Sequence, residues 1–163
     1  MAELTPLDEK LGEVLGLAQA AQAATDTVRR MEGADAFAGD LDEMRTQAEE
    51  TEQRTAALVD TLEGRKTAIR EKARETKSEA SEMMKTYLSG EEEALDGFEF
   101  LSMAEAGELC HWEIVQVIAD KAGEAEASQL AGWAVDVQRA HVEGVRRAYL
   151  SLAAEEAKEM ASA

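Results

Sequence analysis

Two residues in the second half of the chain, Glu108 and His111, could do chemistry together. They begin and end the run Glu-Leu-Cys-His, and a spacing of three places a carboxylate and an imidazole side by side on one helix face. A second imidazole, His141, follows on the next expected helix. A buried ionisable group costs several kcal/mol unless it is paired, hydrogen-bonded or bound to a metal. The surroundings of these side chains therefore decide what they do.

The element that must position Glu108 and His111 is a helix over residues 98–122. Apolar residues recur there at spacings of three and four, so that one face should consist of Leu101, Ala104, Glu108, His111, Trp112, Val115, Ile118 and Ala122. The next helix should present Leu130, Trp133, Ala134, Val137, His141, Val145, Ala148 and Leu152. Because both faces are largely apolar, we expect Glu108 and both histidines to lie close together inside a bundle.

A metal site is the first chemistry that this pattern predicts. In four-helix bundles, Glu-x-x-His motifs on facing helices hold di-iron and di-manganese centres. The expected ligands are Glu108, His111, His141 and Glu52, with Asp8, Asp136 and Gln138 as companions. The ion would be iron or manganese. The alternative is a metal-free polar layer, in which these side chains hydrogen-bond to one another and fix the helix register.

The donor set is weaker than that of a complete dinuclear centre. The fourth long helix offers Gln138-x-x-His141, and a neutral Gln removes a negative charge that two divalent ions need. On the second helix, Arg54 lies near the expected level of the site. The single Cys110 is expected to be a packing residue, because no Lys, Arg or second thiol within a helical turn would activate it. We therefore predict no catalytic residue, and enzymatic activity would depend on an intact metal site.

The composition predicts one all-α domain spanning residues 1–163. The chain is 45% hydrophobic, contains one Pro and lacks β-branched runs. Its 35 acidic and 17 basic residues give a net charge of −18. A basic surface that could bind the phosphates of nucleic acid is therefore not expected. Such a charge fits either an ordinary solubilising surface or adaptation to high salt.

The sequence also predicts a cytoplasmic protein without a membrane partner. No segment approaches the roughly 20 apolar residues of a membrane span, and residues 1–6 have neither the basic nor the apolar part of a signal peptide. A single cysteine cannot form an internal disulfide, which fits a reducing compartment.

Four long helices and one charged connection are expected from the apolar spacing. The helices should cover residues 5–31, 40–62, 97–123 and 124–159, with Phe37 filling the first turn, Asp40 capping the second helix and Gly97 opening the third. Residues 65–82 are charged nearly all round and predict a helical crossover of low stability. The crossover ends in the apolar residues Met83, Met84, Tyr87 and Leu88. Burial of these residues against a second copy predicts a homodimer.

The chain resembles the ferritin-like helical bundles of the YciE/YciF type. The resemblance covers nearly the whole chain and is carried by helix order and by the patterns Leu7-Asp-Glu-Lys-Leu11, Ala48-Glu-Glu-Thr51 and Cys110-His-Trp-Glu-Ile114. It implies a ferritin-like four-helix bundle with a long helical crossover between the second and third helices, a dimer, and a stress-associated role.

The resemblance further implies Glu and His at the level of a metal site, and this chain departs from that pattern. The family's acid beside the third-helix histidine falls on Cys110, its second-helix histidine on Arg54 and its fourth-helix acid on Gln138. Glu113 is retained. Two hypotheses follow: a ferritin-like protein that binds iron or manganese and oxidises Fe(II), or a non-catalytic bundle that acts through dimerisation or partner binding after losing its metal site.

Overall fold

The computed structural model describes residues 3–163 and contains five α-helices and one short 3-10 turn, with no strand in that range. The helices are α1 (Pro6–Arg29), α2 (Ala38–Asp60), α3 (Lys66–Tyr87), α4 (Ala94–Ala122) and α5 (Ala125–Ser162), and the turn is η1 (Ala34–Phe37). The prediction of an all-α fold is confirmed.

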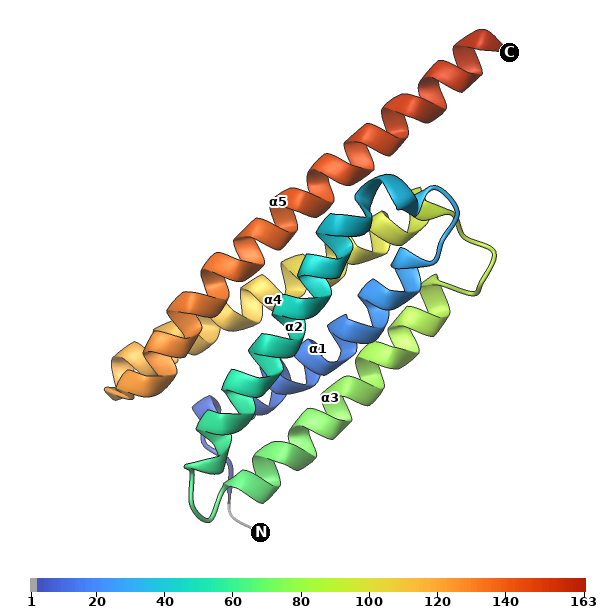
Figure 1. Cartoon of the computed structure of the whole chain (residues 1–163). Helices are drawn as coiled ribbons and strands as arrows, with labels where there is room; N and C mark the ends of the chain where they lie inside the picture. Colours follow the sequence, from blue (N-terminus) through green and yellow to red (C-terminus); the bar gives the residue numbers. More distant parts are fainter. Residues whose placement is uncertain (1–2) are drawn as a thin grey trace.

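Four of the helices form a bundle in which neighbours are antiparallel (Figure 1). Helix α1 packs against α2 and α4, and α5 packs against α4 and α2. Helix α3 is the connection from α2 to α4, and it packs along α1 on the outside of these four helices. The predicted crossover is therefore a complete helix that buries only Ile69, Ala73 and Thr76.

Close contact between α1 and α3 depends on two glycines one helical turn apart. A Cβ atom on Gly12 would lie 2.7 Å from the Cβ of Lys72, and one on Gly16 would lie 2.9 Å from the Cβ of Thr76. Real Cβ atoms do not approach other carbon atoms so closely, so only glycine fits at these positions. The run Gly-Glu-Val-Leu-Gly is thus what brings the two backbones together.

Helix ends follow local chemistry and correct two of the expected starts. Helix α4 begins at Ala94, before Gly97, because Glu93 and Asp96 form a reciprocal capping box. Helix α2 begins at Ala38, so Asp40 lies in its first turn and is not its cap. Phe37 does fill the first turn, with its ring 5.2 Å from that of Phe98 in an edge-to-face arrangement.

The apolar core is divided into two clusters along the bundle axis. The upper cluster in Figure 1 is centred on Val28, Leu41, Phe98, Leu101 and Val145. The lower one is centred on Leu11, Val14, Val59, Ile69, Trp112 and Val115. Between them, α2, α4 and α5 each contribute buried polar residues in place of apolar ones, and this level contains the candidate site.

Candidate functional site: a buried polar layer

The layer between the two clusters is built from one turn on each of three helices. On α4, Glu105 and Glu108 separate Leu101 from Trp112, and both carboxylates are almost fully buried, with exposures of 2% and 3%. Helix α5 contributes Gln138 and His141, and α2 contributes Thr51 and Thr55. Each hydroxyl on α2 donates to the carbonyl four residues earlier in its own helix, so neither is left unpaired.

His141 joins three helices through its two ring nitrogens. Its Nδ1 lies 3.0 Å from Oε2 of Glu105 on α4, and its Nε2 lies 2.6 Å from Oε1 of Gln47 on α2. The imidazole is 5% exposed. Both nitrogens contact protein oxygens, so a metal ion could bind either nitrogen only by displacing one of these oxygens. The prediction that His141 lies in the bundle interior is confirmed.

Glu108 forms its hydrogen bond with an amide instead of an imidazole. Gln138 donates from Nε2 to Oε2 of Glu108 at 2.9 Å. Burial, together with the neighbouring charge of Glu105, raises the pKa of Glu108 well above its ordinary value. The protonated form of this carboxyl is therefore favoured. Within residues 3–163, Oε1 of Gln138 and Nε1 of Trp112 are buried without a hydrogen-bond partner, so the layer is not fully satisfied.

His111 lies outside this layer, and the prediction that it is an interior residue is wrong. Its side chain is 33% exposed, and its Nε2 lies 3.3 Å from Oε2 of Glu13 on α1. Its Nδ1 is 2.8 Å from the carbonyl oxygen of Gly107, a geometry in which the ring nitrogen donates. Glu13 also pairs with Lys10 at 2.6 Å. No hydrogen bond or ion pair within the described residues joins either imidazole to Glu108.

The remaining candidates are dispersed. Glu52 accepts from Nε2 of Gln19 at 3.0 Å and from Nε2 of Gln22 at 2.6 Å, and so joins α2 to α1. Asp8 is fully buried near the start of α1, where it completes the capping box of that helix and pairs with Arg65 at 2.9 Å. Asp136 is exposed.

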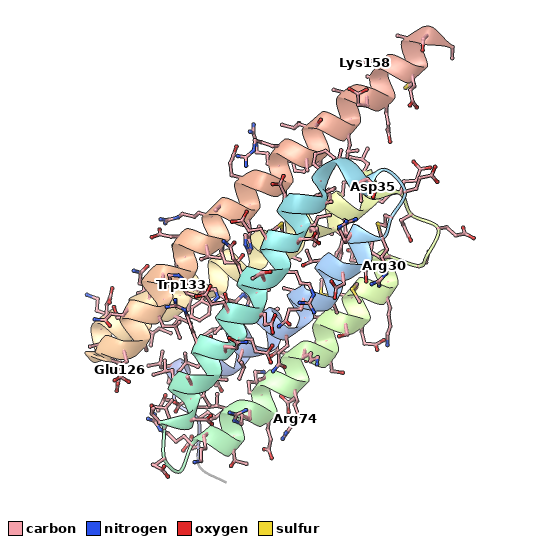
Figure 2. All side chains as sticks on the ribbon, in the orientation of Figure 1. Arg30, Asp35, Arg74, Glu126, Trp133 and Lys158 are labelled. Atoms are coloured by element: carbon pink, nitrogen blue, oxygen red, sulfur yellow. The ribbon has the colours of Figure 1, made fainter. Side chains whose placement is uncertain are left out.

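Two other residues singled out by the sequence are on the surface. The guanidinium of Arg54 stacks on the ring of Trp133 at 4.2 Å, on the side of α5 that faces α2 (Figure 2). Cys110 is an exposed free cysteine, so its expected packing role is wrong. The reason is that its neighbours on the buried face are Glu108 and Trp112, which places position 110 on the outer side of α4.

These side chains do not fit an iron or manganese centre. The part of the chain from residue 3 onward has no group of three or more His, Cys, Asp or Glu side chains that could hold a metal ion. The would-be ligands are separated into a His141 network, a Glu108–Gln138 pair, a His111–Glu13 pair and a Glu52 pair with two amides. Each is already engaged by protein groups. Three or four such donors would have to break these bonds before they could converge on one ion.

The sequence analysis missed Glu105 and Gln47, the two partners of His141. The signal for Glu105 was present, because the buried face of α4 follows Leu101, Glu105, Glu108, Trp112, Val115 and Ala119, with spacings that alternate between four and three. The predicted face contained Ala104 and His111 instead, and each of them lies one position before a residue that is buried in the structure. Gln47 had no comparable signal, since it neighbours the buried Ala48 and Thr51 without being apolar.

A second feature is an apolar groove between α3 and α4, with α1 as its floor. The groove has a volume of about 280 Å³ and is lined mainly by Leu17, Ala20, Ala21, Ala24, Ala80, Met83, Met84, Phe100, Met103 and Ala104, with Glu108 and His111 near one end. It exists because α3 and α4 both pack on α1 and hardly touch each other. Alanines along its floor are too small to fill the space.

Comparison of the chain with family models, curated proteins and solved structures finds no match. Among the described helices, none combines the length and the apolar character that a membrane crossing requires. Function is therefore argued from the polar layer and the apolar groove.

Proposed function

We propose that the protein is a non-catalytic helical bundle that acts through association, with a homodimer as its working form. The observation that carries the proposal is the apolar groove between α3 and α4 together with the exposed apolar side chains at its rim. Met83, Tyr87 and Met103 are 54%, 53% and 48% exposed. Burying the exposed half of such a side chain contributes about 1 kcal/mol, so the rim favours association.

The arrangement of the helices supports a ferritin-like assignment. Two antiparallel pairs, α1 with α2 and α4 with α5, are joined by one long connection, which is the pattern of ferritin-like bundles. In this proposal, the polar layer is a device that fixes helix register. Its donors are bound to one another, so it supports the second hypothesis, in which iron or manganese chemistry has been lost. The stress-associated role that the resemblance implies stays a prediction.

The mass of the protein in solution tests the proposal. Multi-angle light scattering at micromolar concentration should give twice the 17.7 kDa of one chain. Moderate salt is required, because a net charge of −18 on each copy opposes association at low ionic strength. A monomer under these conditions would overturn the proposal. The metal content of freshly purified protein tests the rival hypothesis, which requires stoichiometric iron or manganese.

A further inference from the structure

The last part of α5 extends well beyond the rest of the bundle (Figure 1). Leu152 is the final residue that packs against the upper core cluster, and every residue from Ala153 to Ala163 is exposed. We call Leu150–Ser162 the arm. Figure 2 shows Lys158 on the arm, past the ends of the other helices. From Ala153 onward, the arm thus contributes nothing to the core of its own chain.

Where the arm begins, the apolar residues of α5 move to the opposite face of the helix. Within the bundle, the buried stripe runs through His141, Val145 and Ala148 to Leu152. The next positions on that stripe are Glu155, Glu156 and Glu159. The opposite face of the arm instead carries Leu150, Ala153, Ala154, Ala157, Met160 and Ala161. A helix of this pattern is amphipathic, with its apolar side turned away from its own bundle.

Two residues of this face are exposed apolar anchors. Leu150 is 48% exposed and Met160 is 81% exposed. They are ten residues apart, which is about 15 Å along a helix. The groove extends along α4 from Phe100 to His111, a length of about 16 Å by the same rise per residue. The arm and the groove are therefore matched in length as well as in apolar character.

The length and the apolar character that the arm and the groove share favour a second copy of this chain as the partner. The carboxylates of the arm, Glu155, Glu156 and Glu159, continue the stripe that is buried within the bundle, and so lie on the face opposite its apolar residues. An arm that lies over the groove would turn these charges away from it, so that apolar side chains make the contact.

The positions of the arm and the groove also allow two copies to form a closed, symmetric dimer. The groove lies between the final turns of α3 and the first half of α4, and α5 leaves the bundle at this same end (Figure 1). Two copies related by a twofold axis could each place an arm on the other's groove. Such an interface is self-complementary and stops at two chains. The groove is too small for a helix, so the arm would lie over it and insert side chains.

We propose that the arm of one copy docks over the α3–α4 groove of a second copy, and that the second arm docks reciprocally. This inference rests on the proposed function, because it names the surface through which the homodimer forms. Helix-in-groove recognition by a few apolar anchors is a common mode of association.

Paired substitutions on the two faces of the arm test this inference. Leu150→Glu with Met160→Glu should raise the dimer Kd by about 100-fold or more, because charges replace the anchors on both arms. Ser151→Glu with Ser162→Glu adds the same charge on the other face and should leave the mass that of a dimer. Circular dichroism should show the same helical content in both variants, since none of these residues is in the core.

Cross-linking between two preparations identifies what the arm touches. Both carry Cys110→Ser; one also carries Met160→Cys and the other Met103→Cys. After mixing, a short bismaleimide should join the two chains, and Ser162→Cys in place of Met160→Cys should give much less product. A dimer that persists when residues 153–163 are deleted would overturn this inference and leave the proposed function standing. A full chain that is monomeric would overturn both.

Discussion

Replacement of Glu108 by Gln should stabilise the protein, and the gain should grow with pH. The carboxyl of Glu108 is 3% exposed, and its pKa is raised well above the ordinary value by burial and by Glu105. Gln has the shape of the protonated acid, and its oxygen can still accept from Gln138. The substitution therefore removes the ionisable group while keeping the hydrogen bond.

The size of the effect follows from proton linkage. In the unfolded chain, a Glu loses its proton near pH 4.3, whereas folded Glu108 holds its proton to a higher pH. Between these two values the unfolded state binds fewer protons, so the free energy of unfolding falls as pH rises, by about 1.4 kcal/mol per pH unit for one group. Glu108→Gln removes this loss. The advantage of the variant over the parent should therefore be larger at pH 8 than at pH 5.

Urea unfolding followed by circular dichroism at pH 5 and pH 8 measures the difference between variant and parent. Glu99→Gln is the matched control, because it removes an equal charge from an exposed position on the same helix. That control should change stability by a few tenths of a kcal/mol at either pH. An advantage of Glu108→Gln that does not grow with pH, or a loss at pH 8, would refute the reasoning about burial.

Three further outcomes are expected. His141→Ala should lower the free energy of unfolding by about 1–3 kcal/mol, measured in urea, because it leaves a buried carboxylate unpaired, and iron or manganese uptake should stay negligible. Gly16→Ala should cost about 1–3 kcal/mol through a clash with α3, whereas Gly39→Ala, with open space around it, should cost little. Amide hydrogen exchange should be faster in α3 than in α4, since α3 buries only three residues; slower exchange there would contradict this.

The number and limits of the helices could be predicted because apolar spacing and breaker residues act locally. Gly123 caps the end of α4 and Gly33 begins the turn η1 that follows α1; both have left-handed backbone angles and lie close to where the sequence predicts the helices to end. The start of α4 was displaced by three residues, because the capping box of Glu93 and Asp96 is stronger than the glycine that follows it. Local chemistry of this kind can be recognised once both members of the box are considered.

The composition of the polar layer was harder to predict, because it depends on helix rotation. An error of one position is a rotation of about 100° on a helix, which is enough to exchange Glu105 for Ala104 and to move His111 to the surface. Glu108 and His141 lie near the centre of their stripes, so their burial was predicted in spite of this error. Their partners are set by the rotation of three helices at once, which no single stripe specifies.

Close packing of α1 on α3 explains why an apolar groove remains open in this fold. Gly12 and Gly16 draw α3 against one side of α1, so that α3 cannot also cover α4. The floor between them consists of alanines, which allow close approach but fill little space. A chain that needed only a closed bundle could place Leu at Ala20 or Ala24 and fill this groove. The small residues there, together with an arm whose apolar face turns away from its own core, support the proposal that another chain covers this surface.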